Sequence, residues 1–186
     1  MQECGPRRGL KAFAAILVAV GLMGCGLAGG GVAFGAEGCT LSPYEHDASL
    51  KVLRCGNNLI VRSSRDAQYT PLGPAGSKMP SEIELEDGAL LIEFHPVGSS
   101  EFQILTPLAI AAVRGTKWAV EVSTARTSTL VLDGAVSVTN RRLRQPVILT
   151  KGQGVDISPS DTSVVRKQWG QARIQVLMSR FGEYAN

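Results

Sequence analysis

The feature that most constrains the fold is a series of short apolar segments, closely spaced and separated by proline, glycine or Asp-Gly steps. From residue 82 onward they read "EIELEDGALLIEFHP", "EFQILTP", "TKWAVEVS", "TSTLVLDGAVSVTN" and "QPVILTKGQGVDIS". Apolar residues alternate along them, as Leu130, Leu132, Val136 and Val138 do, which is the pattern of a strand with one buried face. The sequence therefore predicts a mainly β domain.

Two Asp-Gly steps, Asp87-Gly88 and Asp133-Gly134, are strong short-range turn signals. They belong to a weak internal repeat, in which "LEDGALLIEF" and "QILTPLAIAAV" are echoed by "VLDGAVSVT" and "VILTKGQGVDI". The Asp-Gly steps lie 46 residues apart and the "ILT" triplets 44 residues apart. Such self-similarity is typical of stacked β-layers, so we expect a compact β-roll or β-solenoid-like domain.

Upstream of these segments, "ASLKVLRCGNNLIVRSS" predicts two short strands around the turn "CGNN". The segment 69–82 holds three prolines and two glycines. Because proline cannot donate to a sheet ladder and glycine favours tight turns, we predict a loop there.

Toward the C-terminus the apolar period becomes helical, and one α-helix is expected within residues 159–186, packing on or capping the β domain at an open end or edge. A partner-binding or membrane-surface helix is the alternative. Candidate N-caps are Ser160, Asp161 and Ser163, and Gly182 lies where a C-cap would. The predicted apolar stripe consists of Val165, Trp169, Ala172, Val176, Leu177 and Phe181.

The first 36 residues differ in composition from the rest. Arg7, Arg8 and Lys11 form a basic head, and an apolar stretch at 12–23 follows, which is typical of a secretory signal peptide. Its removal predicts an exported protein, periplasmic or secreted. An uncleaved anchor is the alternative, because weakly apolar residues continue for about 25 positions. The predicted organisation is a signal peptide at 1–36, a β domain at 37–158 and a helical region at 159–186.

Two processing sites are open. "LMGC" resembles a bacterial lipobox, in which Cys25 would be lipidated and would anchor the protein to a membrane. "VAFGAE" instead fits ordinary cleavage before Ala36, because Ala33 and Gly35 satisfy the small-residue rule. We slightly favour ordinary processing.

Removal of the signal leaves two cysteines, Cys39 and Cys55. Two cysteines at this separation in an exported domain predict one disulfide bond. A metal pair is less well supported, because no further Cys or His accompanies them with ligand spacing.

The segment "ILTPLAIAAVRGTKWAVEV" interrupts its strand pattern with Arg-Gly-Thr. After the break Trp118 and Val120 share one face, and the same parity extended backward places Arg114 on the apolar side. A buried arginine needs acceptors for its five N–H donors, which backbone carbonyls at a corner near Gly115 would supply. We favour this structural role. The alternative is an exposed Arg114 that grips an anionic ligand or a carboxylate.

Three motifs combine in this chain: a T-P-x5-V-R-G-T-x-(F/W)-x-V stretch, a later (E/D)-G-x-V turn and a closing G-(Q/E) segment. The matching residues are Thr106, Pro107, Val113, Arg114, Gly115, Thr116, Trp118, Val120, Asp133, Gly134, Val136, Gly152 and Gln153. Over roughly residues 45–157 the chain resembles the FecR domain family. The resemblance implies a β-rich periplasmic domain of β-solenoid-like character. In the family's best-known members this domain relays occupancy of an outer-membrane siderophore receptor to a cytoplasmic sigma factor.

Few residues suggest catalysis or ligand binding. The two histidines, His46 and His95, lie in no nucleophile or metal motif, so no catalytic residue, metal or cofactor is expected. The net charge of +3 falls to +1 without the signal segment, which holds three basic residues and one acidic residue, and this argues against nucleic-acid binding. The one dense basic cluster, "NRRLRQ" at 140–145, is interpreted as a solvated hairpin tip. Binding of an acidic partner or a lipid head group is the alternative.

We therefore expect a non-enzymatic exported FecR-like domain, acting as a sensing or protein-binding module of the bacterial envelope in iron uptake or envelope signalling. The expected partner is an envelope protein. Direct contact with a sigma factor is not expected, because only 11 residues precede the apolar core. The alternative is a structural or lipid-anchored envelope protein without a signalling role.

The intact mass of the protein recovered from its native envelope tests the processing predictions. We expect a mass that begins near Ala36 and increases by about two hydrogens on reduction, because a disulfide takes up two hydrogens. A diacylated or triacylated Cys25 would instead establish a lipoprotein, and an uncleaved mass would contradict the predicted signal peptide.

Overall fold

The computed structural model describes residues 38–183. The predicted signal peptide at 1–36, lipidation at Cys25 and cleavage before Ala36 lie outside the described residues.

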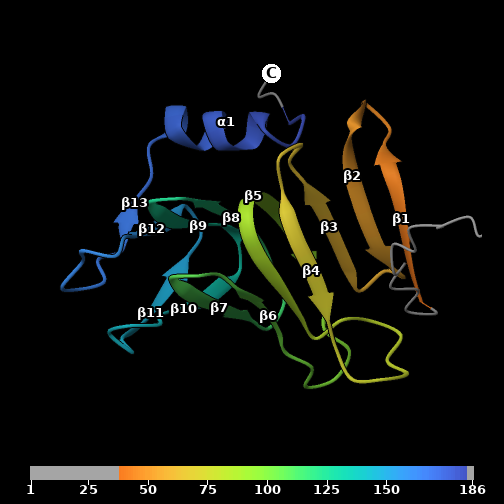
Figure 1. The fold of residues 1–186 in the computed structure, drawn as a ribbon, viewed down its shortest axis with the longest axis horizontal. Coiled ribbons are helices and arrows are strands. Elements are labelled where there is room, and N and C mark those ends of the chain that lie inside the picture. The colour runs from red at the N-terminus through yellow and green to blue at the C-terminus, as the bar shows by residue number, and fades with distance from the viewer. Residues whose placement is uncertain (1–37, 184–186) are drawn as a thin grey trace, which may run out of the picture. The chain divides into compact units, whose positions relative to one another are not determined.

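The described chain is mainly β with one short C-terminal helix, as predicted (Figure 1). The helix α1 is Gln171–Ser179. The strands are β1 (Cys39–Tyr44), β2 (Asp47–Cys55), β3 (Leu59–Ser63), β4 (Gln68–Leu72), β5 (Glu82–Phe94), β6 (Phe102–Leu105), β7 (Ala109–Val113), β8 (Thr116–Ser123), β9 (Arg126–Asp133), β10 (Ala135–Asn140), β11 (Pro146–Thr150), β12 (Gln153–Ile157) and β13 (Lys167–Gln168).

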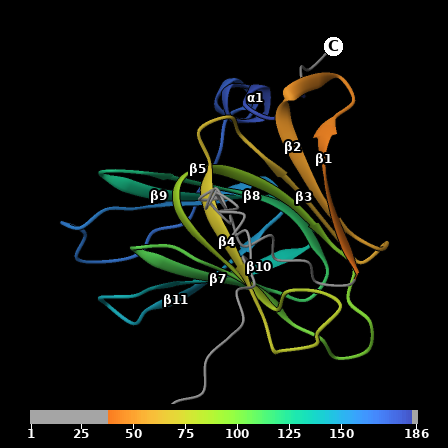
Figure 2. The same cartoon turned by 45° about the vertical axis from the view of Figure 1, so that its right-hand side comes forward.

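These strands form one sheet that curls into two facing layers. Layer A has the order β1-β2-β3-β5-β8-β9-β12-β13, and layer B has the order β4-β5-β6-β7-β10-β11. Figure 2 shows β8 and β9 in one layer and β7, β10 and β11 in the other. Among the described strands, every pairing is antiparallel except the parallel pair of β5 and β6.

Strand β5 belongs to both layers because it bends at Gly88. Residues 82–87 pair with β4 and β6, and residues 88–94 pair with β3 and β8. Gly88 has a φ of +82°, and a Cβ there would lie 2.5 Å from the Cα of Ala67. The first Asp-Gly step is therefore a bend within a strand, and its prediction as a turn between strands was wrong.

Two further glycines carry the chain between the layers. Gly115 joins β7 of layer B to β8 of layer A, and Gly134 joins β9 of layer A to β10 of layer B. Their φ values are +87° and +82°, and a Cβ on Gly134 would lie 2.7 Å from the carbonyl oxygen of Gly115. The two crossings thus lie against each other, and they join the layers at one corner of the roll.

The main core fills the space between the layers. It is built from the residues that alternate inward, so the predicted parity of Trp118 and Val120 is confirmed. Burial of one such large apolar side chain contributes about 1.5–3 kcal/mol. Its largest members with essentially no exposed surface are Trp118, Phe94, Phe102, Leu59, Ile83, Leu85, Leu90, Ile92, Ile104 and Leu149.

Two local predictions for the N-terminal half have different outcomes. The disulfide is confirmed, and it joins Cys39 and Cys55 at directly opposed positions of β1 and β2. A closed loop of this size stabilises a fold by about 3 kcal/mol. The loop predicted at 69–82 is wrong at its start, because β4 begins at Gln68. Pro71 is tolerated there since β4 is an edge strand that pairs only with β5.

The C-terminal helix is shorter than predicted. It begins after Gly170, so Ser160, Asp161 and Ser163 are not its N-caps. The preceding segment instead forms a loop and the short strand β13, whose pairing with β12 outweighs the helical period. Val165 is exposed as a result.

Helix α1 covers the outer face of layer A, whereas an end or edge had been predicted (Figure 1). Of the predicted stripe, Trp169, Leu177 and Phe181 are buried, while Ala172 and Val176 are exposed. The cluster beneath the helix consists of Ala89, Leu91, Ala119, Leu130, Trp169, Leu177, Met178 and Phe181.

Substitution of Gly88 by alanine tests the bend of β5. Gly76 is a matched control, because its φ is +77° and nothing lies within 4 Å of the place that a Cβ would take. We expect Gly76→Ala to cost about 1 kcal/mol from the left-handed backbone alone, and Gly88→Ala to cost about 3 kcal/mol because backbone atoms must also move. Urea unfolding at pH 7 measures both, and equal losses would contradict the close approach.

Candidate functional site

The motif residues found in the sequence are divided between two ends of the strands. One end, the corner end, comprises 113–116 and 133–135, where the chain changes layers. The other, the tip end, comprises the turns 106–109, 123–126 and 140–145. Strands β7, β8, β9 and β10 run between the two ends, so the structure does not gather the motif into a single site.

At the corner end the polar motif side chains contribute to the fold. The Oγ1 of Thr116 is nearly buried and donates a hydrogen bond to the carbonyl oxygen of Ala135 at 2.9 Å. This bond fastens the start of β8 to the start of β10 across the corner. Trp118 follows in the main core, while Asp133 is exposed beside Gly134.

Arg114 is exposed, so the prediction that it points inward was wrong. Its side chain is 72% exposed, and its Nε donates to the Oε1 of Glu101 at 2.7 Å. The parity argument fails because Gly115 takes a left-handed conformation between β7 and β8, which resets the alternation of faces. An exposed ion pair of this kind contributes at most about 1 kcal/mol.

At the tip end Thr106 organises the turn between β6 and β7. It is 2% exposed, and its Oγ1 accepts hydrogen bonds from the N–H of Ala109 at 2.9 Å and from the Oγ1 of Thr127 at 3.1 Å. Its carbonyl oxygen accepts a hydrogen bond from the Nη1 of Arg141 at 2.9 Å. Thr106 therefore connects the turn of layer B both to β9 and to the basic hairpin, while Pro107 beside it is exposed.

The basic hairpin at 140–145 has a fixed backbone. The buried Oδ1 of Asn140 accepts the N–H groups of Arg142 and Leu143, each at 2.9 Å, and its carbonyl oxygen accepts the N–H of Arg144 at 2.8 Å. Arg144 has a φ of 54°, which is unusual for a residue other than glycine. The arginines are exposed, as the sequence indicated, but they stand on a turn whose shape is set by hydrogen bonds.

A groove of about 330 Å³ lies beside this hairpin, and we call it the tip groove. Its lining comes from three separate segments of the chain, so the sequence pattern could not reveal it. The residues that line it are Pro107, Leu108, Asn140, Arg141, Arg142, Ile157, Ser158 and Pro159.

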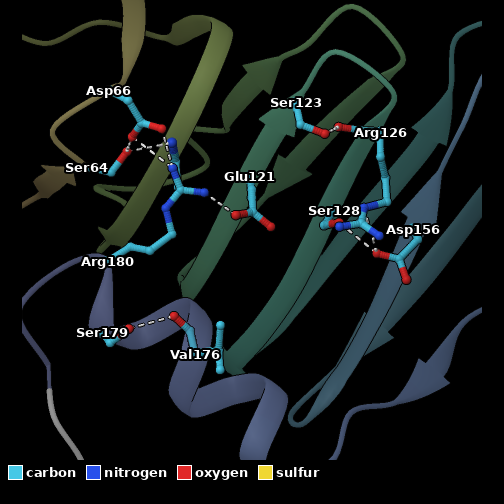
Figure 3. Close-up of polar contacts among 11 residues, drawn as sticks. Ser64, Asp66, Glu121, Ser123, Arg126, Ser128, Asp156, Val176, Ser179 and Arg180 are labelled. Atoms are coloured by element: carbon cyan, nitrogen blue, oxygen red, sulfur yellow. Dashed lines mark hydrogen bonds and ion pairs between the residues drawn. The ribbon is translucent and has the colours of Figure 1, made fainter.

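A third set of polar contacts fastens α1 to layer A (Figure 3). Arg180, just after the helix, binds both carboxylate oxygens of Asp66 at 2.6 and 2.8 Å and also pairs with Glu121. Arg173 on the helix binds the carboxylate of Asp156 on β12, with one contact at 2.9 Å. These pairs border the apolar cluster beneath the helix and hold α1 in register with the strands.

Two of these carboxylates, Asp66 and Asp156, have pKa values below the usual value of an aspartate. The hydrogen bond from Ser64, followed by that from Arg180, holds the pKa of Asp66 below its usual value. For Asp156 partial burial raises the pKa, but the hydrogen bonds from Arg173 and Ser128 outweigh burial and leave the pKa below its usual value. Both groups are therefore ionised at neutral pH and attract the helix.

Residues 38–183 contain neither a metal-binding cluster nor a membrane-spanning helix. No three His, Cys, Asp or Glu side chains in this range lie close enough together to hold a metal ion. No helix within it has the length and apolar character needed to cross a membrane. His95 is exposed just after β5, and its backbone exchanges hydrogen bonds with Asn58 at the end of the strand.

Comparison with known proteins adds a family and a fold. Residues 47–137 match the family model described as FecR protein. None of the curated proteins matches the chain. The fold is similar to a crystal structure of a candidate anti-sigma factor from Parabacteroides distasonis, with a TM-score of 0.51 and 14% sequence identity. That match covers 64% of this chain and 56% of the other, so this chain spans little more than half of its structural relative. A second structure from that organism, described in the same words, has a TM-score of 0.49, 12% identity and coverages of 75% and 60%.

Acidification tests the ion pairs of α1. A carboxylate whose pKa is lowered in the folded state stabilises the fold above its unfolded pKa, near 3.8, and this stabilisation is lost as the pH falls through the lowered value. We expect the double variant Asp66→Asn, Asp156→Asn to be about 1–2 kcal/mol less stable than wild type at pH 7. It should also lose less stability than wild type between pH 4 and pH 2.

Urea unfolding followed by tryptophan fluorescence at each pH measures this difference. Glu84→Gln, an exposed residue of β5, is the control that should leave the pH profile unchanged. Parallel profiles for wild type and the double variant would contradict the assignment.

Proposed function

Residues 47–137 form a domain of the FecR family, and from this premise we propose that the chain is a non-enzymatic, exported protein-binding module of a cell-envelope signalling system. The structural relative is described as a candidate anti-sigma factor, which favours signalling over a purely structural role. In this proposal the module senses its signal through a protein partner in the envelope.

The observation that carries the proposal is that most residues of the family motif stabilise the fold and do not form a reactive site. Thr106 and Thr116 make hydrogen bonds within the fold, Trp118 is buried in the core, and Gly134 closes the corner. Arg114 is exposed but already paired with Glu101. A motif used in this way builds a scaffold, and the function of such a domain lies in the surface that the scaffold presents.

The disulfide supports export. Cys39 and Cys55 are bonded, and disulfides form and persist in oxidising compartments outside the cytosol. We propose a periplasmic or secreted protein with a cleaved signal. A lipoprotein anchored at Cys25 is the alternative location, and it would suit the same function.

Deletion of the gene tests the signalling role. We expect the deletion strain to change the transcription of a small set of envelope or iron-uptake genes, because a relay that has lost its sensor no longer adjusts its regulator. Sequencing of total messenger RNA from wild-type, deleted and complemented cells, with and without iron limitation, measures this change.

The complemented strain is the control and should restore the wild-type pattern. Unchanged transcription together with a permeable or fragile envelope would contradict the signalling role and favour the structural alternative.

A further inference from the structure

The tip end concentrates positive charge that the fold does not neutralise. Within residues 38–183 no carboxylate lies within ion-pair distance of Arg141, Arg142 or Arg144. All three side chains are exposed. Each guanidinium offers five N–H donors, and the structure uses only part of this capacity, on the carbonyl oxygens of Thr106 and Asp161. Free donors on exposed arginines are available to an anionic ligand.

Two of these arginines, Arg141 and Arg142, are held in place before any ligand binds. The N–H of Arg141 donates to the carbonyl oxygen of Leu108 at 3.0 Å, which adds a backbone link to its side-chain bond with Thr106. Arg142 donates to the carbonyl oxygen of Asp161. The hairpin is thus held by the 106–109 turn on one side and by the loop after β12 on the other. Fixing the binding groups in advance lowers the entropy cost of binding.

The tip groove combines this charge with an apolar lining. Leu108, Ile157 and the two prolines at 107 and 159 provide apolar surface, and Arg141 and Arg142 supply cations beside it. Among residues 38–183, none of those that line the groove is acidic. A site of this composition suits a ligand that carries carboxylates and apolar side chains together.

A second depression adjoins the tip groove and lengthens it. It has a volume of about 440 Å³, and Ser158 lines both depressions. Its two carboxylates are already engaged, because Asp161 accepts hydrogen bonds from Ser158 and Asp156 is paired with Arg173. Lys167 adds positive charge there, whereas Arg126 lies 3.8 Å from the same Asp156 carboxylate and shares that ion pair. Together, the linings of the two depressions that make up this cleft hold more basic than acidic residues.

We propose that this cleft binds an acidic, partly apolar segment of a protein partner, with carboxylates on Arg141, Arg142 and Arg144 and apolar side chains in the tip groove. The inference rests on the proposed function for the existence of a protein partner. A peptide is favoured over a membrane surface because the site is concave and because the guanidinium fork matches a carboxylate with two parallel hydrogen bonds.

Selection of peptides on the protein tests this inference without a named partner. The disulfide-bonded exported chain is immobilised and panned against a random dodecapeptide display library. We expect the selected peptides to be enriched in Asp and Glu about threefold or more over the unselected library, since charge complementarity selects partners. The best peptide is then labelled with fluorescein, and its Kd is measured by anisotropy at low and high salt.

The test variant is Arg142→Gln, Arg144→Asn, in which asparagine tolerates the positive φ of position 144. Its matched control is Lys51→Gln, Arg54→Gln on β2, which removes the same charge from exposed residues of another strand. We expect the test variant to weaken peptide binding about tenfold or more, and the control less than about twofold. Should the double variant unfold in urea more readily than wild type, Arg144→Asn alone serves, because the side chain of Arg144 makes no hydrogen bond or ion pair within residues 38–183.

Three outcomes overturn the inference: selected peptides without acidic enrichment, equal weakening by both variants, or sedimentation with phosphatidylglycerol vesicles that depends on Arg142 and Arg144 without acidic peptide binding. The last outcome would assign the cleft to a lipid surface.

Failure of the peptide-binding inference is distinguishable from failure of the proposed signalling role. If only the cleft fails, gene deletion still changes transcription; if only the role fails, acidic peptides still bind while transcription is unaltered.

Discussion

The close contact between the two layer crossings, Gly134 against the carbonyl oxygen of Gly115, is the constraint on which the rest of the structure depends. It brings the strand pairs β7–β8 and β9–β10 to one corner, and the hydroxyl of Thr116 secures that corner. Because a left-handed backbone without a side chain is required there, the family motif sets its geometry through glycines and not through reactive groups. The same corner turns Arg114 outward and directs the strands toward the tip end.

A second apolar surface, on the outer face of layer A, is covered by helix α1. Central strands β5, β8 and β9 place apolar residues on both faces, and α1 covers the outer one with Leu177 and Phe181. Ion pairs around this cluster, such as Arg180 with Asp66, fix the helix in place. The helix and its ion pairs therefore occupy the outer face of layer A, while the arginines of the basic hairpin are exposed at the tip end.

Much of the fold was predictable from local pattern. The alternation of Trp118 and Val120, the strands around "CGNN" and the Cys39–Cys55 bond follow from period, turn residues and cysteine number. Two of the errors share one cause, which is that tertiary pairing overrides local preference. Pro71 enters an edge strand, and the predicted helix start is taken by β13. Only part of the candidate site could be predicted from the sequence. The basic hairpin is one continuous segment, whereas the tip groove is lined by three separate segments.

The mainly β class, the glycines at which the chain bends and the family motif follow from the amino-acid sequence, because they depend on residue period and on backbone freedom at single positions. Tertiary contacts set which bends join the two layers and on which face α1 lies. Those features depend on contacts between residues far apart in the chain, such as Gly88 with Ala67 and Arg141 with Thr106, and no local pattern encodes such contacts.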